Sequence, residues 1–100
     1  EKWRLQLLEY LRGNRELALS RLREINGLIP YSPEATYLLW MDARKLPVPN
    51  PHQFFEEHGV GLSDGRYFGS PGFLRMNLGC ARSLLEDALG RMNKACQSLT

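Results

Sequence analysis

Hydrophobic residues recur every three or four positions along residues 1–26, a segment without proline. This spacing places them on one face of a long helix. The predicted buried face consists of Trp3, Leu7, Leu11, Asn14, Ala18, Leu22 and Ile25. Asn14 is polar, so we expect a neighbouring backbone group to satisfy its side chain. The opposite face is mostly charged and is predicted to face solvent.

Residues 28–42 are predicted to contain two strands. Pro30 and Pro33 lack a backbone donor, which limits residues 28–34 to an edge strand or an extended connector. The run TYLLWMD, residues 36–42, is apolar and rich in β-forming residues. Its length and composition predict a central strand that is buried on both faces.

A second, shorter helix follows the proline-rich loop at residues 43–50. Asn50 is suited to the N-cap position because its side-chain oxygen accepts a hydrogen bond from the first helical turn. Pro51 is suited to the first helical position. The helix is predicted to end at Gly59, and residues 60–63 are predicted to form a short strand.

Strict alternation of residue types marks residues 73–78, FLRMNL, as a strand with two different faces. The pattern puts Leu74, Met76 and Leu78 on one face and Phe73, Arg75 and Asn77 on the other. The preceding stretch 64–72 is rich in glycine and is predicted to be irregular. It lacks the sequence context of a phosphate-binding loop.

A third helix is predicted near the end of the chain. Ser83 and Glu86 have the spacing of a capping box. The predicted buried stripe of this helix consists of Leu85, Ala88, Leu89, Met92 and Cys96. The resulting order of elements predicts one α+β domain over residues 1–100. Its small, mostly antiparallel sheet has three or four strands, with helices packed on one face and a long N-terminal helix before it.

Composition excludes several classes of function. Thirteen basic and eleven acidic residues give a formal charge of +2 and form no basic stripe, so neither nucleic acid nor a membrane is predicted as a partner. No apolar run is long enough to cross a bilayer, and a cytoplasmic location is expected. Cys80 and Cys96 have no metal-binding spacing, and His52 and His58 lie six positions apart, so no metal site is predicted.

Arg75 is the residue whose placement suggests chemistry. An arginine fixed on a rigid strand presents a planar set of donors that matches a carboxylate. The alternative from the residues alone is an exposed strand arginine whose aliphatic stem covers apolar neighbours. Alternation leaves both interpretations open.

Four stretches resemble the C-terminal part of fold-type I pyridoxal-phosphate (PLP) enzymes. They are YLRGNRELAL (10–19), ATYLLWMDAR (35–44), FFEEHGVGLSDGRYFG (54–69) and GFLRMNLGCARSLLEDAL (72–89). Within that group the chain is similar to cystathionine β-lyase-like C–S lyases of the class I and II aminotransferase family. The chain departs from the family pattern at Ala35, where glycine is usual, and at Ala81, where proline is common.

The resemblance implies a role for particular residues. It identifies Arg75 as the arginine that binds the substrate α-carboxylate. Tyr37 is implied as a further substrate-binding residue, and the substrate-entrance loop is implied to contain Asp64, Gly65, Phe68 and Gly69. Asn77 is also expected to bind substrate, because alternation places it on the same strand face as Arg75. No catalytic residue is expected within these 100 residues.

The resemblance also implies what lies outside these residues. The cofactor is expected to be PLP, bound mainly by a large domain upstream of residue 1 that carries the Schiff-base lysine. The expected partners are that domain, a small amino-acid substrate and a second subunit of a homodimer. The expected reaction is C–S β-elimination, with the isolated chain inactive. A class I/II aminotransferase and a non-catalytic interaction module remain alternatives.

Overall fold

The computed structural model describes residues 2–31 and 37–99. In chain order its elements are α1 (Lys2–Arg23), β1 (Ile29–Pro30), β2 (Leu38–Asp42), α2 (Pro51–Glu57), β3 (Ser63–Asp64), the short 3-10 helix η1 (Gly65–Phe68), β4 (Phe73–Asn77) and α3 (Arg82–Gln97). The predicted α+β class and the predicted order of helices and strands are confirmed. Ala35, residues 32–34 of the predicted edge segment and residue 36 of the predicted central strand lie outside the described residues.

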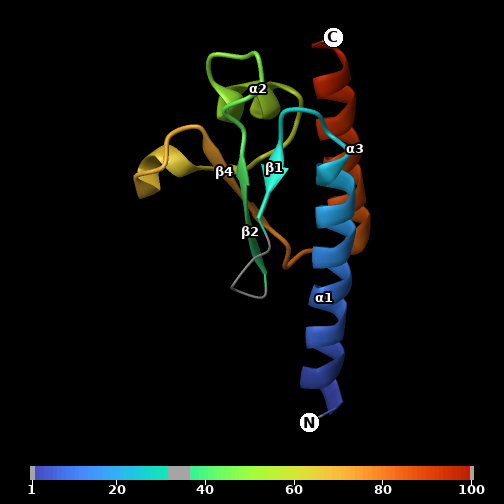
Figure 1. The fold of residues 1–100 in the computed structure, drawn as a ribbon. Helices are drawn as coiled ribbons and strands as arrows, with labels where there is room; N and C mark the ends of the chain where they lie inside the picture. The colour runs from blue at the N-terminus through green and yellow to red at the C-terminus, as the bar shows by residue number, and fades with distance from the viewer. Residues whose placement is uncertain (1, 32–36, 100) are drawn as a thin grey trace.

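The four strands form one antiparallel sheet in the order β1-β2-β4-β3. The long helices α1 and α3 lie side by side on one side of this sheet (Figure 1). β1 is an edge strand, as its proline content predicts. β2 and β4 are the central pair, with Trp40 opposite Arg75 in the register.

Alternation along β4 sorts its residues as predicted. Leu74 and Met76 are buried in the core between the sheet and the helices, whereas Arg75 on the other face is only half-buried. The prediction that β2 is buried on both faces is wrong. Leu39 and Met41 are buried, but Trp40 remains partly exposed because the long helices α1 and α3 lie on the other face of the sheet.

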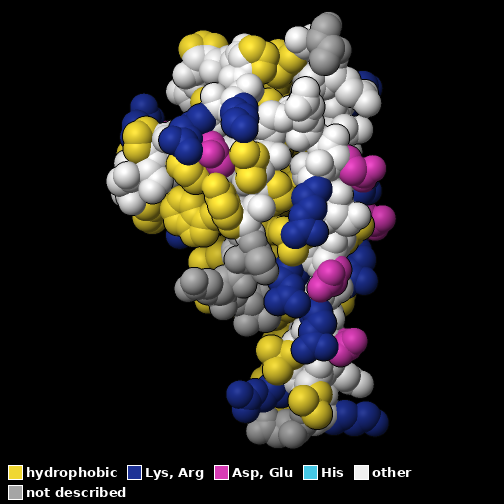
Figure 2. All heavy atoms as spheres, viewed as in Figure 1, with side chains coloured by type: hydrophobic (Ala, Val, Ile, Leu, Met, Phe, Trp, Pro, Cys, Tyr) yellow, Lys and Arg dark blue, Asp and Glu magenta, His cyan; other side chains and the backbone are white. Residues whose placement is uncertain are grey.

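Only the C-terminal part of α1 is buried as predicted. Asn14 and Leu22 are fully buried, whereas Trp3 is 67% exposed and Leu7 is 47% exposed. The N-terminal half of α1 extends beyond the sheet and α3 (Figure 1), and Figure 2 shows hydrophobic side chains between basic ones at that end. Trp3, Leu5 and Leu7 therefore remain exposed, whereas Leu11 is buried.

Local sequence predicts the start of α2 correctly and the start of α3 wrongly. Asn50 caps α2, with its Oδ1 atom accepting a hydrogen bond from the Gln53 backbone N–H at 3.2 Å. The predicted capping box of the last helix is wrong, because α3 begins one residue before Ser83 and no side chain of its N-cap residue makes a capping bond. The Tyr10 hydroxyl of α1 instead accepts a hydrogen bond from the Arg82 backbone N–H at 2.6 Å.

The segment predicted as irregular contains η1. The strand expected at residues 60–63 is wrong for residues 60–62, because the strand observed here is β3, which consists of Ser63 and Asp64. No α-helix within residues 2–31 and 37–99 has the length and apolar character that crossing a membrane requires.

Candidate functional site

The site is centred on Arg75, in the middle of β4. Its side chain faces away from the long helices, and its register partners are Trp40 on β2 and Ser63 on β3. Because β4 lies between β2 and β3, strands on both sides hold its backbone in place. The position therefore has the rigidity expected of a binding site that is built on a sheet.

Two aromatic rings flank the Arg75 guanidinium. Its Cζ atom lies 4.4 Å from the ring centroid of Phe68 and 6.0 Å from that of Trp40. The two rings meet edge to face, with their centroids 5.9 Å apart. These distances are within the range of cation–π attraction.

No described residue accepts a hydrogen bond from the Arg75 side chain. Its Nε atom is shielded from solvent and has no hydrogen-bond partner among residues 2–31 and 37–99. Leaving a buried donor unsatisfied costs about 1–3 kcal/mol. The terminal nitrogens of the guanidinium also have no described acceptor and are not shielded from solvent in this way, so they are the donors that an acidic ligand could reach, which makes Arg75 the candidate anchor for such a ligand.

The nearby Arg44 is engaged in a different way. It donates from Nε and from a terminal nitrogen to the two carboxylate oxygens of Asp42, at 3.0 and 2.9 Å, and its Cζ atom lies 4.9 Å from the Phe73 ring centroid. Hydrogen bonding from Arg44 holds the pKa of Asp42 below its usual value. This arginine has its carboxylate within the chain, whereas Arg75 does not.

The predicted entrance loop brings Phe68 to Arg75. Asp64 is the N-cap of η1, and its side chain accepts a hydrogen bond from the Arg66 backbone N–H at 2.9 Å. A Cβ atom on Gly65 would lie 2.5 Å from two backbone carbonyl oxygens, so only glycine fits there. Gly69 ends η1 with a φ of 79°. Of the four predicted loop residues, Phe68 is the one whose ring lies against Arg75, and the other three shape the turn.

Neither Asn77 nor Tyr37 is paired with Arg75 across the sheet. Asn77 is on the same face of β4 as Arg75, but its Oδ1 atom already accepts a hydrogen bond from the Gly79 backbone N–H at 2.7 Å. Tyr37 precedes β2 by one residue, and its ring is half-exposed without a ring contact to Arg75. Their proposed contact with substrate remains a prediction.

Sequence reasoning missed Trp40. The prediction that its strand is buried on both faces concealed the role of an aromatic side chain on the open face. Its position, directly opposite Arg75 across the strand pair, depends on the pairing register. Sequence alone does not give that register.

The described residues offer no lysine suited to a Schiff base with PLP. The three lysines of the chain, Lys2, Lys45 and Lys94, are all exposed. A Schiff-base lysine requires a desolvated or electropositive setting. Residues 2–31 and 37–99 also contain no group of three or more metal-ligating side chains. Among the described residues, the side chain best suited to bind a ligand is therefore Arg75, whose guanidinium has no described acceptor.

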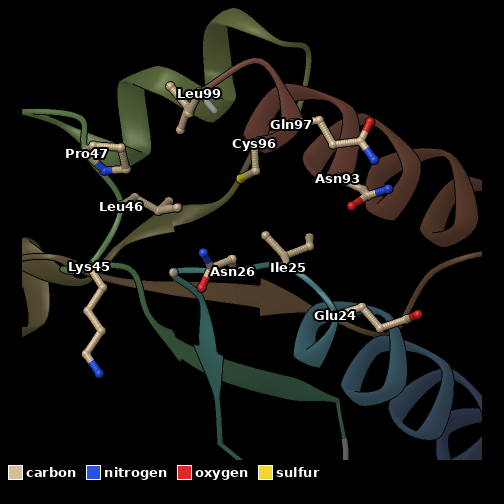
Figure 3. A pocket seen from close by; sticks show the side chains of 11 residues that line it. Glu24, Ile25, Asn26, Lys45, Leu46, Pro47, Asn93, Cys96, Gln97 and Leu99 are labelled. Carbon is tan, nitrogen blue, oxygen red and sulfur yellow. The ribbon is translucent and has the colours of Figure 1, made fainter.

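A hollow of about 410 Å³ lies elsewhere, between the end of α1, the loop at residues 45–47 and the end of α3. Figure 3 shows the Cys96 sulfur between these segments, with Lys45 pointing away. Burial raises the pKa of the Cys96 thiol, which keeps the thiol protonated and unreactive. The hollow shares no residue with the Arg75 site.

Comparisons with known proteins show which family this chain is similar to. The family model for aminotransferase class I and II matches residues 2–92. Cystathionine β-lyase from Corynebacterium glutamicum is 36% identical over 90 residues, covering 85% of this chain and 24% of that protein.

Solved structures extend the likeness to the fold. The structure of OvoB is 46% identical with a TM-score of 0.92, covering 97% of this chain and 26% of that chain. A PLP-bound structure from Clostridium difficile 630, named as an aminotransferase, is 36% identical with a TM-score of 0.86 and covers 96% of this chain and 26% of that one. The chain thus spans about a quarter of the length of the relatives it matches.

Proposed function

Because the chain belongs to the class I and II aminotransferase family, we propose that it is the C-terminal small domain of a PLP-dependent C–S β-lyase. In this proposal Arg75 binds the α-carboxylate of a sulfur-containing amino acid. The similarity to a cystathionine β-lyase over 85% of the chain supports the choice of lyase.

The observation that carries the proposal is the unpaired state of Arg75. Its buried Nε atom has no hydrogen-bond partner among the described residues, and two aromatic rings lie against the guanidinium. A carboxylate accepts two parallel hydrogen bonds from a guanidinium and supplies the missing negative charge. The substrate class that fits this anchor is an amino acid with a free carboxylate.

The proposed reaction converts a sulfur amino acid and water into a thiol, pyruvate and ammonia. The bond between Cβ and sulfur breaks, and the sulfur leaves with a proton. PLP supplies an electron sink when it is bound, and its lysine is expected outside these 100 residues. Arg75 fixes the carboxylate on Cα, and this orients the Cα–H bond for proton removal.

The remainder of the site is proposed to come from other parts of the polypeptide and from a second subunit. The exposed apolar residues in the N-terminal half of α1 support contact with a further folded unit, since a monomeric domain rarely exposes such a patch. We therefore expect the isolated chain to be inactive and prone to self-association.

Replacing the anchor tests the proposal. In the full-length protein, Arg75→Ala is expected to raise KM for the amino-acid substrate and to lower kcat/KM about 100-fold or more, because a charged pair of hydrogen bonds is lost. The matched control is Arg44→Ala, which removes an arginine that already pairs with Asp42. An unchanged KM in Arg75→Ala would remove the carboxylate role.

An aminotransferase is the second candidate, favoured by the name of the similar Clostridium difficile protein. The two reactions differ in their products. A transaminase consumes a keto-acid co-substrate and returns one amino acid for each one used, whereas the lyase releases a thiol and ammonia. Product analysis with and without a keto acid separates them.

A non-catalytic interaction module is the third candidate, because the described residues contain no lysine suited to PLP. The visible absorption spectrum of the full-length protein tests it. An absorption band that borohydride abolishes is expected for a PLP enzyme. A colourless protein that binds no added PLP would favour the module.

A further inference from the structure

We propose that Phe68 is a positioning residue, which holds the Arg75 guanidinium in its carboxylate-binding orientation without using any of its hydrogen-bond donors. The inference rests on the proposed carboxylate role of Arg75 and adds the group that orients it. Trp40 provides a second ring, and the rings of Phe68 and Trp40 together are called the aromatic clamp. The experiment below separates failure of this inference from failure of the carboxylate role.

The physical basis is the difference between a ring and an oxygen as a partner. A carboxylate or carbonyl oxygen orients a guanidinium by accepting N–H donors, which are then unavailable to a ligand. An aromatic face attracts the cation through its quadrupole and leaves the donors in the guanidinium plane unpaired. At Arg75 two rings are within range and no described residue accepts a hydrogen bond from the guanidinium, as this account requires.

The loop that carries Phe68 is built to place it. Gly65 packs so closely on the Phe73 and Ser70 carbonyls that a Cβ atom would lie 2.5 Å from each oxygen. The Ser70 backbone N–H donates to the Gly65 carbonyl at 2.8 Å, closing the loop at its base. Phe68 itself is 51% exposed, so burying its own surface does not explain its position.

The neighbouring Tyr67 supplies a matched control. It is also an aromatic residue of η1, is 77% exposed, and lies against Arg66 with 5.3 Å between the Arg66 Cζ atom and the ring centroid. Removing its ring takes away a similar aromatic surface one position from Phe68. It leaves the Arg75 contacts in place.

The test uses the full-length holoenzyme and two readouts. One is KM and kcat for the amino-acid substrate, and the other is the calorimetric dissociation constant for propionate, a simple carboxylate probe. Phe68→Leu is expected to raise KM and the propionate dissociation constant roughly threefold to thirtyfold, in line with a partly buried cation–π contact. Phe68→Tyr keeps the ring and is expected to bind within about twofold of wild type.

The outcomes separate the two proposals. Wild-type propionate binding in Phe68→Leu, together with lost binding in Arg75→Ala, would overturn the positioning role alone. Wild-type binding in Arg75→Ala would overturn the carboxylate role and this inference with it. Equal weakening by Phe68→Leu and Tyr67→Leu would assign the effect to the loop and would also overturn the inference.

A second variant covers the case in which Phe68→Leu lowers the thermal midpoint of the protein. Trp40→Leu removes the other ring from β2 without touching η1 and is expected to weaken propionate binding in the same direction. Wild-type binding in Trp40→Leu would then count against an aromatic clamp.

Discussion

Arg75 and Arg82 lie seven residues apart but have opposite surroundings. Arg82 donates from Nε to the Asn14 side-chain oxygen at 2.8 Å and from a terminal nitrogen to the Tyr10 carbonyl at 3.0 Å. Arg75 has two aromatic rings and no described acceptor. An arginine whose donors are used within the chain stabilises the fold, whereas one whose donors are kept unpaired is available to a ligand.

The region around Arg82 joins the two long helices and the end of β4. Asn14 is fully buried and donates to the Leu78 and Cys80 carbonyls at 2.8 and 3.0 Å. The Tyr10 hydroxyl donates to the Cys80 carbonyl at 3.2 Å. These contacts hold the chain at the point where it leaves the strand that carries Arg75. The hydrogen bonds around Arg82 therefore help to hold β4, and with it Arg75, in position.

The largest expected effect comes from removing the centre of this network. Asn14→Leu leaves the Leu78 carbonyl and the Arg82 Nε atom without the Asn14 side chain, whereas the Cys80 carbonyl keeps the Tyr10 hydroxyl as a donor. We expect the free energy of unfolding to fall by about 3 kcal/mol, since each unsatisfied buried group costs about 1–3 kcal/mol and partial relaxation offsets some of it. Urea unfolding of the full-length protein measures it. A loss below about 1 kcal/mol would contradict the buried network.

A matched pair of substitutions tests the comparison directly. Methionine keeps much of the apolar stem of an arginine and removes its charge. Arg82→Met is expected to lower the free energy of unfolding by about 2 kcal/mol because the Asn14 oxygen loses its donor. Arg75→Met is expected to lower it by less than Arg82→Met does, because no described hydrogen bond is lost and removal of the unsatisfied Nε atom offsets the loss of the two ring contacts.

Ligand binding is expected to show the reverse order. Arg75→Met abolishes propionate binding, whereas Arg82→Met keeps it wherever the protein remains folded. Equal losses of stability in the two variants would mean that Arg75 also serves the fold, and the distinction between the two arginines would fail.

The sequence predicts the periodic parts of this molecule well. The alternation in residues 73–78 places Arg75 on the face opposite Leu74, and the apolar spacing in α1 identifies Asn14 as a polar residue within the buried face. Both predictions rest on the periodicity of side chains within one helix or one strand. Neither depends on a distant partner.

Features that depend on distant residues were missed. Tyr10 caps α3 from 72 positions away, so the local capping pattern at Ser83 predicted the wrong start. Trp40 meets Arg75 through the strand register, and Phe68 meets it through a turn that Gly65 permits. Local propensity does not contain these pairings, because tertiary packing decides them.

A smaller effect is expected at the N-cap of α3. Ala81 has a φ of −61°, the angle that a proline ring imposes, and its N–H donates to no described residue. Ala81→Pro is expected to stabilise the protein by about 0.4–1 kcal/mol by restricting the unfolded chain. Urea unfolding measures the gain, and propionate binding at Arg75 should be unchanged. A destabilised variant would show that Cys80 does not accept a following proline.

The smallest effect concerns the arginine that shares a region with Arg75 but pairs within the chain. Hydrogen bonding from Arg44 lowers the pKa of Asp42 below its reference value of 3.8. The stability that this carboxylate contributes is therefore present above pH 3.8 and is lost as the pH falls through its lower folded pKa. The difference in free energy of unfolding between wild type and Asp42→Asn should shrink in that acid range. Arg44→Gln removes the hydrogen bonds to Asp42 and should abolish this dependence on pH. Arg75→Met should keep the dependence of the free energy of unfolding on pH that wild type shows, because Arg75 has no described carboxylate partner. A changed dependence would reveal an anionic partner for Arg75 within the protein.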